Sequence, residues 1–208
     1  MTTEVMSEDV AEGPAKPMRA DARRNYERLV DAARRVFTEH GGDASMEAIA
    51  KEAGVGVGTL YRHFPKRIDV VEAVYRNDVD TLIDAADRGM LDPGPWDALA
   101  SWLRAYVDYA QAKKVFLNEL HEAFDKNPEL KLDSRERIWA SCDRLLVRAQ
   151  EAGEARCDIN GEDLMQLVSP MCVHATLDPA QSERLLAMVL DGLRPPPEAA
   201  PRLDPRQH

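Results

Sequence analysis

The 208-residue sequence is poor in cysteine and has no long apolar run. Its three cysteines, Cys142, Cys157 and Cys172, lie 15 residues apart and form no close-spaced metal or redox pair. An odd number of cysteines in a chain without a signal peptide indicates reduced thiols. No apolar run approaches the ~18 residues needed to span a bilayer, and the acidic N-terminal residues do not resemble a signal peptide. We therefore expect a cytoplasmic protein with no membrane partner.

Sequence signatures of catalysis are absent as well. The chain contains no phosphate-binding loop, no dinucleotide-binding fingerprint and no nucleophile–base pattern. The residues that come nearest to a metal cluster are Glu119, His121 and Glu122, and no second Glu-x-x-His pattern accompanies them. From these absences we expect no enzymatic activity, no cofactor and no metal site.

What the sequence does contain is helical periodicity. Hydrophobic residues make up 44% and charged residues 31% of the chain, a balance typical of soluble globular proteins. Apolar residues recur at helical spacing without strand-like alternation, so we expect an all-α fold of about nine helices. Asp21 is expected to cap the first helix and Pro65 to begin the fourth. The expected helices cover about 21–40, 46–53, 57–63, 65–89, 95–113, 114–126, 133–152, 161–176 and 179–193.

Polar ends and one internal break divide the chain. Residues 1–18 are polar, residues 195–208 begin with three prolines, and we expect both segments to be disordered tails. The segment Asp92-Pro-Gly-Pro interrupts the helical pattern after the fourth expected helix. We therefore expect an N-terminal domain over residues 19–83 and a C-terminal domain over residues 84–194.

Charge is distributed unevenly over these parts. The net charge of the chain is −10, which by itself argues against a nucleic-acid partner. Residues 19–67, however, hold ten basic and seven acidic side chains, whereas residues 68–208 hold 16 basic and 26 acidic ones. A basic N-terminal segment on an acidic body predicts that one end of the molecule faces an anion.

The segment over residues 45–64 has the layout of a helix-turn-helix unit. Ser45 is a candidate N-cap of the first short helix, and Gly54 permits a sharp turn after it. Ala50 is small where two crossing helices approach closely, and Val55 and Leu60 can fill the space between them. The second short helix then carries hydroxyl, aromatic and basic groups that can reach phosphates and base edges. A generic helical hairpin with a polar outer face is the alternative.

Residues 23–83 resemble the DNA-binding domain of the TetR family of transcriptional regulators. The resemblance is carried by Ala32-Ala33, Phe37, Gly41, Ser45-Met46, Ile49-Ala50, Ala53-Gly54-Val55 and the run Gly58-Thr-Leu-Tyr-Arg-His-Phe64. It implies that residues 57–63 form a recognition helix that enters the major groove of a double-stranded operator. The side chains and backbone that the resemblance places near DNA are Arg19, Arg23, Arg24, Ser45, Val57, Gly58, Thr59, Tyr61, Arg62, His63, Lys66 and Arg67.

Three positions depart from the family's usual pattern. Gly56 and Val57 stand where many members have serine followed by a polar or basic residue, so a side-chain cap and a polar base contact are missing. Arg67 stands where the family usually has a phosphate-binding lysine.

Gly58 lies inside a short helix, where glycine costs about 1 kcal/mol relative to alanine. It is either a permissive surface position or a point of close backbone approach to DNA.

The C-terminal half is similar to the SbtR-like subgroup of the family. This resemblance implies that the protein forms a homodimer and binds a small-molecule effector, which the sequence does not identify. Aromatic and flexible apolar residues there suit a pocket between helices, although such a stripe also fits a plain core. The candidate pocket residues are Trp102, Tyr106, Tyr109, Phe116, Leu120, His121, Phe124, Trp139, Cys142, Met165 and Met171. The candidate dimer residues on the last two helices are Leu164, Leu167, Val168, Leu186, Val189, Leu190 and Leu193.

These features favour a dimeric DNA-binding repressor that a small molecule releases from a palindromic operator. Two alternatives stay open at this point. One is an all-helical small-molecule or metal binder, or an enzyme, and a stoichiometric bound ion would favour it. The other is a protein–protein adaptor that has lost DNA binding, for which the basic, hydroxyl-bearing second helix would serve no purpose.

Overall fold

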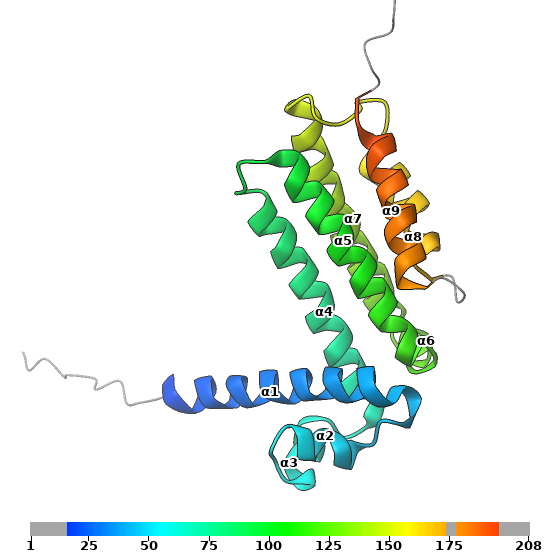
Figure 1. Cartoon of the computed structure of the whole chain (residues 1–208). Helices are drawn as coiled ribbons and strands as arrows, with labels where there is room; N and C mark the ends of the chain where they lie inside the picture. The colour runs from blue at the N-terminus through cyan, green and yellow to red at the C-terminus, as the bar shows by residue number, and fades with distance from the viewer. Residues whose placement is uncertain (1–15, 174–177, 196–208) are drawn as a thin grey trace, which may run out of the picture.

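The computed structural model describes residues 16–173 and 178–195, and within these ranges every regular element is helical (Figure 1). Nine α-helices and two short 3-10 segments follow one another in these residues, as the all-α prediction required. The N-terminal unit contains α1 (Lys16–His40), the 3-10 turn η1 (Gly41–Asp43), α2 (Met46–Glu52) and α3 (Val57–His63).

The N-terminal unit is built around the apolar stripe of α1. Leu29, Val30 and Phe37 of α1 are buried together with Ile49 of α2 and Leu60 of α3. These side chains recur at helical spacing on each element, so one face of every helix turns toward the shared core. In Figure 1, α1 lies across the base of the molecule and α2 and α3 lie beneath it.

The first helix begins earlier than the sequence pattern indicated. It starts at Lys16, so Asp21 lies inside the helix and is not its N-cap, and residues 16–18 are helical. Pro17 is tolerated there because the N–H groups of the first turn have no helical acceptor. The expected disorder of residues 1–15 and 196–208 lies outside the described residues.

The remaining helices form a long bundle above this base. They are α4 (Arg67–Gly89), α5 (Pro95–Ala112), the 3-10 segment η2 (Lys113–Phe116), α6 (Leu117–Lys126), α7 (Pro128–Glu151), α8 (Gly161–Val173) and α9 (Pro179–Leu193). Helix α4 packs on α1 below and on α5, α6 and α7 above (Figure 1). It is therefore the element that belongs to both units, and α8 and α9 lie along the outer side of the bundle.

Several helix boundaries differ from those expected, for identifiable reasons. Helix α4 begins at Arg67 rather than at Pro65, because the Asp69 carboxylate accepts a hydrogen bond from the Lys66 backbone N–H at 2.8 Å and caps the start of the helix there. The helix expected over 95–113 ends at 112, and a 3-10 segment separates it from α6. Helix α7 begins at Pro128, not near 133, because Asn127 caps it and proline suits the first helical position. Of the helix expected over 161–176, residues 174–176 lie outside the described residues.

Candidate DNA-binding surface and effector cavity

The turn between α2 and α3 depends on one glycine. Gly54 has a φ of +67°, in the left-handed region where side-chain-bearing residues are strained. Its N–H donates to the carbonyl of Lys51 at 3.1 Å, and the Val55 N–H donates to that of Ala50 at 3.0 Å. This pair of bonds is a Schellman motif, which ends a helix and reverses the chain. Arg28 of α1 adds a hydrogen bond to the Ala53 carbonyl at 2.8 Å, so the turn is fixed against α1.

The start of α2 is capped as the sequence predicted. The Ser45 hydroxyl oxygen accepts a hydrogen bond from the Ala48 backbone N–H at 3.1 Å. Ser45 is exposed, whereas the next residue, Met46, is buried. The Ser45 hydroxyl and the positive end of a short helix therefore lie at the surface of the unit.

Helix α3 divides cleanly into an anchored and an exposed side. Leu60 and the following Phe64 are buried in the core. On the other side Tyr61 is 43% exposed, and Arg62 and Gly58 are also exposed. An outward-facing aromatic and a guanidinium on a rigidly held helix can contact phosphates and base edges in a groove. The two other predicted contact residues of this helix, Val57 and Thr59, are partly buried at its edge.

The first half of α1 lies beside this exposed side of α3. Nε2 of His63 lies 3.3 Å from Nδ2 of Asn25, and the His63 ring packs at 6.5 Å from the ring of the half-exposed Tyr26. His63 is thus an exposed side chain held in place by α1. Asn25 and Tyr26 were not among the predicted surface residues, because only the packing of α1 on α3 brings them there.

The basic residues predicted near DNA differ in their surroundings. Arg23 and Arg24 are exposed on α1, and Arg23 pairs with Glu27 at 2.9 Å. Arg19 lies in α1, but its side chain is outside the described part of the structure. Lys66 is exposed beside the end of α3.

Arg67, by contrast, points into the protein. Its guanidinium donates to the carbonyl oxygens of Gly42, at 3.1 Å, and Ala44, and to a carboxylate oxygen of Glu119 at 3.1 Å. It also lies 5.1 Å from the ring centre of Phe37. Arg67 therefore joins the α1–α2 connection to α6. The preceding residue, Lys66, was also predicted to lie near DNA, and its side chain is exposed to solvent.

A cavity of about 290 Å³ lies between the helices of the C-terminal half. It is lined from α4, α5, η2, α6, α7 and α8. Four of the predicted pocket residues line it, namely Tyr106, Tyr109, Phe124 and Trp139. The Tyr106 hydroxyl lies 2.8 Å from that of Ser169, and burial raises the pKa of this phenol to about 12.

The other seven predicted pocket residues lie elsewhere. Trp102 is buried and donates from its indole N–H to the Leu82 carbonyl at 2.9 Å, and Phe116 packs against Phe37. His121 is exposed on α6, and Met171 lines a groove between α8 and α9. Three residues are buried in the helical core, which are Leu120, Cys142 and Met165.

Two of the three cysteines have thiols that do not readily ionise. Burial raises the pKa of Cys142 to about 12 and that of Cys172 to about 11, and both thiols are buried. Because the thiolate is the form that oxidants attack, these two side chains resist oxidation. Cys157 is exposed and unpaired in the described structure.

The cavity also has cationic lining residues that sequence reasoning missed. Lys113, Lys131 and Arg135 line it, together with Tyr75 and Ser169. Lys131, Arg135 and Trp139 are spaced four residues apart on α7, so they share one face of that helix. This signal was present in the sequence, but a helix expected to begin near residue 133 left Lys131 outside the pattern.

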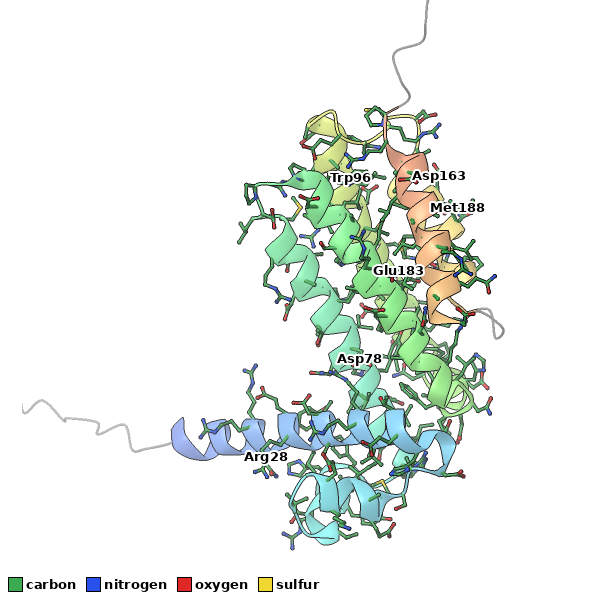
Figure 2. The ribbon with its side chains drawn as sticks, viewed as in Figure 1. Arg28, Asp78, Trp96, Asp163, Glu183 and Met188 are labelled. Carbon is green, nitrogen blue, oxygen red and sulfur yellow. The ribbon has the colours of Figure 1, made fainter. Side chains whose placement is uncertain are left out.

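A larger apolar groove of about 550 Å³ runs between α8 and α9. Leu167 and Met188, which are 62% and 69% exposed, lie on it. Figure 2 shows Met188 on α9 and Asp163 on α8 at the outer side of the bundle. Of the predicted dimer residues, Leu164, Leu167, Val189 and Leu193 line this groove. The remaining three, Val168, Leu186 and Leu190, are buried within the subunit.

A membrane-spanning helix or a cluster of metal ligands would indicate another class of function. Among residues 16–173 and 178–195, none of the helices is both long enough and apolar enough to cross a membrane. The same residues contain no group of three histidine, cysteine or acidic side chains placed to bind a metal ion, and that includes the segment around His121.

Comparison with known proteins agrees with both halves of the structure. Residues 29–74 match the family model described as bacterial regulatory proteins, tetR family, and residues 94–195 match that of the SbtR-like transcriptional regulator C-terminal domain. An HTH-type transcriptional regulator of Staphylococcus aureus is 45% identical over 67 residues, which are 32% of this chain and 36% of that protein. The chain therefore spans about a third of the length of the curated relatives that it matches.

Two solved structures match over most of their length. A TetR transcriptional regulator from Streptomyces coelicolor is 40% identical, with a TM-score of 0.74 over 83% of this chain and 99% of that one. A TetR transcription regulatory protein from Mycobacterium vanbaalenii is 33% identical, with a TM-score of 0.68 over 86% of this chain and 99% of that one. With matching family models on both halves and a 40% identical structure matched over nearly its whole length, the chain belongs to the TetR family of transcriptional regulators.

Proposed function

We propose that the protein is a dimeric repressor that binds a palindromic operator and leaves it when a small molecule occupies the cavity between α4, α5, α7 and α8. The observation that carries DNA binding is the rigid presentation of α3. Leu60 and Phe64 anchor this helix in the core, so Tyr61 and Arg62 face outward. A fixed reading helix can select among base sequences, whereas a flexible basic tail cannot.

The charge distribution supports binding through this end alone. The segment over residues 19–67 has three more basic than acidic side chains, while the C-terminal body is strongly acidic. Phosphates attract the first and repel the second, so the protein meets DNA with α3 and the first half of α1.

A dimer is needed for a palindromic operator, because each half-site takes one recognition helix. The groove between α8 and α9 supports such a dimer, since Leu167 and Met188 would otherwise keep their apolar surface in water. A second copy of the same face would cover them and place two α3 helices on one side of the assembly.

Release by a ligand requires that the cavity and α3 be coupled. Helix α4 lines the cavity with Tyr75, and only three residues separate its start from the end of α3. A ligand that binds one position of α4 more tightly than another shifts the population toward it and changes the separation of the two recognition helices.

Selection from a random pool of DNA duplexes tests the DNA-binding proposal. We expect enrichment of near-palindromes whose half-sites lie ~34–36 Å apart, with an affinity that falls steeply with salt. Tyr61→Ala should weaken binding to the selected duplex by about tenfold or more. Val147→Ala, which trims an equally exposed side chain on α7, should leave it unchanged.

Failure to enrich any sequence, or equal binding by Tyr61→Ala and the parent protein, would contradict the assignment of α3. Placing the selected duplex upstream of a reporter gene then separates repression from activation. Loss of reporter output on expression of the protein is the expected result.

A further inference from the structure

We propose that the effector is a small organic anion with an aromatic or apolar body, and that Lys113, Lys131 and Arg135 bind its charged group. This inference rests on the proposed function, because it takes the cavity at Tyr106 and Trp139 to be the effector site. It adds the chemical class of the ligand, which neither the family nor the fold specifies.

The charged side chains that line the cavity are all positive. Its lining includes three cations, Lys113, Lys131 and Arg135, and no acidic residue. None of the three forms an ion pair, within 4 Å, with a carboxylate of the described residues. The chain as a whole is strongly acidic, so a cavity with only positive charge departs from the surrounding composition. Such a site favours an anionic ligand and disfavours a cationic one.

Each of the three cations lies over an aromatic ring. The Lys113 ammonium lies 3.9 Å from the ring centre of Tyr109, and the Arg135 guanidinium lies 4.0 Å from that of Trp139. The Lys131 ammonium lies 5.9 Å from the ring centre of Phe124. Cation–π contacts of this kind orient the charged groups but leave their charge without a counterion. The aromatic rings meanwhile provide the apolar wall that a ligand body needs.

Lys113 is the most enclosed of the three cations. Burial lowers the pKa of Lys113 to about 8, although the carboxylate of Asp78 partly opposes this effect. Asp78 is itself paired with Arg34 of α1, so it does not serve Lys113 as a direct partner. A ligand carboxylate beside Lys113 would provide the missing counterion and favour the ammonium form.

The size of the cavity limits the ligand. Its volume of about 290 Å³ lies just below the usual range for small-molecule sites, ~300–1,000 Å³. Lys131 and Arg135 are exposed where the cavity meets solvent, while Lys113 lies deeper. A single-ring or two-ring aromatic acid therefore suits the space, with its body between the rings of Tyr106 and Trp139.

Matched pairs of uncharged and charged probes test this class. We would titrate the full-length protein, without DNA, with benzoate, 2-naphthylacetate and biphenyl-4-carboxylate, and with the primary amide of each. We expect at least one carboxylate to bind tenfold or more tightly than its amide. In the double variant Lys131→Gln/Arg135→Gln that preference should fall below threefold. Both side chains are exposed, so their replacement leaves no buried charge unpaired and the variant should fold.

A control variant removes the same total charge elsewhere. Lys126→Gln/Arg137→Gln changes two cations that lie outside the cavity and pair with Glu122 and Asp80. It should keep the full preference for the carboxylate. The proposal is wrong if no carboxylate in the panel binds more tightly than its amide, or if the control variant loses the preference equally. Operator binding measured in parallel separates this result from a failure of the proposed function, because neither double variant alters α3.

Discussion

The guanidinium of Arg67 lies 3.1 Å from a carboxylate oxygen of Glu119, and this pair ties the first residue of α4 to α6. The same guanidinium donates to the carbonyl oxygens of Gly42 and Ala44, which connect α1 to α2. One side chain therefore joins the recognition unit to the bundle at the point where α4 passes between them. Any movement of α4 or α6 has to break or carry these bonds.

A double-mutant cycle measures the strength of that pair. Arg67→Gln, Glu119→Gln and the double variant would be unfolded in urea. Because both side chains are only partly buried, we expect a coupling free energy of ~1 kcal/mol, above the median for exposed pairs. The exposed pair Arg23 and Glu27 supplies the comparison and should give less than ~0.5 kcal/mol. A coupling near zero at Arg67 would show that the contact does not link the two units.

Lys66 and Arg67 should affect DNA binding in different ways. Lys66 is exposed near α3, so Lys66→Ala should lower the slope of log affinity against log salt by about one per subunit and leave stability unchanged. Arg67→Gln should lower stability, because three acceptors lose their donor, with a smaller change in the slope. Filter-binding measurements at several salt concentrations, with urea unfolding alongside, test both. A larger slope change for Arg67→Gln would return this residue to the phosphate-contacting role that the family resemblance implied.

Much of the recognition unit could be predicted from the sequence, but only part of the lining of the cavity could. Ser45, Gly54 and Leu60 act through local chemistry, as a cap, a left-handed turn and an apolar anchor, so the pattern reveals them directly. The lining of a cavity depends on how separate helices pack. Trp102 and Trp139 look alike in sequence, yet one donates to a backbone carbonyl in the core and the other faces the cavity. The inward turn of Arg67 likewise depends on where α6 lies.

Gly58 provides a test of close approach between α3 and DNA. A Cβ atom added there would meet nothing within 4 Å, so nothing in the described structure requires a glycine at this position. Gly58→Ala should therefore raise the free energy of unfolding by ~0.5–1 kcal/mol, because alanine is the better helix former. If the backbone lies close to DNA, the same change should weaken operator binding by tenfold or more.

The contrasting change is Gly161→Ala, where the added Cβ would lie 2.7 Å from the Asp143 backbone and should destabilise the protein. Unfolding curves and operator titrations on both variants separate the two effects. Unchanged operator binding by a more stable Gly58→Ala variant would identify Gly58 as a permissive surface position.

Asp78 should make stability depend on pH. Its carboxyl is mostly buried, and the loss of hydration raises its pKa to about 6, against the opposing attractions of Arg34 and Lys113. Between its ordinary pKa and about 6, the folded protein holds this proton and the unfolded chain does not. The stability that the proton provides is therefore present at low pH and is lost as pH rises through about 6, by ~1–3 kcal/mol.

Asp78→Asn removes this titration. As pH rises from 4.5 to 7, the parent protein should therefore lose ~1–3 kcal/mol of unfolding free energy relative to this variant. Val147→Ala, which changes an exposed side chain that does not titrate, should give a difference that stays level with pH. Parallel pH profiles for the parent and Asp78→Asn would mean that the carboxyl titrates normally in the folded state.

The groove between α8 and α9 should hold the dimer together. Leu167→Glu/Met188→Glu places charge on two side chains that are exposed in the single chain, so each subunit should fold as before. Burying those charges against a second copy would be costly, so we expect monomers by light scattering at concentrations where the parent protein is dimeric. The operator affinity should fall at least a hundredfold, because a monomer contacts one half-site.

Leu91→Glu changes an even more exposed leucine, in the α4–α5 connection, and should alter neither property. If the double variant still forms dimers, the interface lies on another face of the subunit. If the variant is monomeric but still binds the full operator with the parent affinity, operator recognition does not require a dimer.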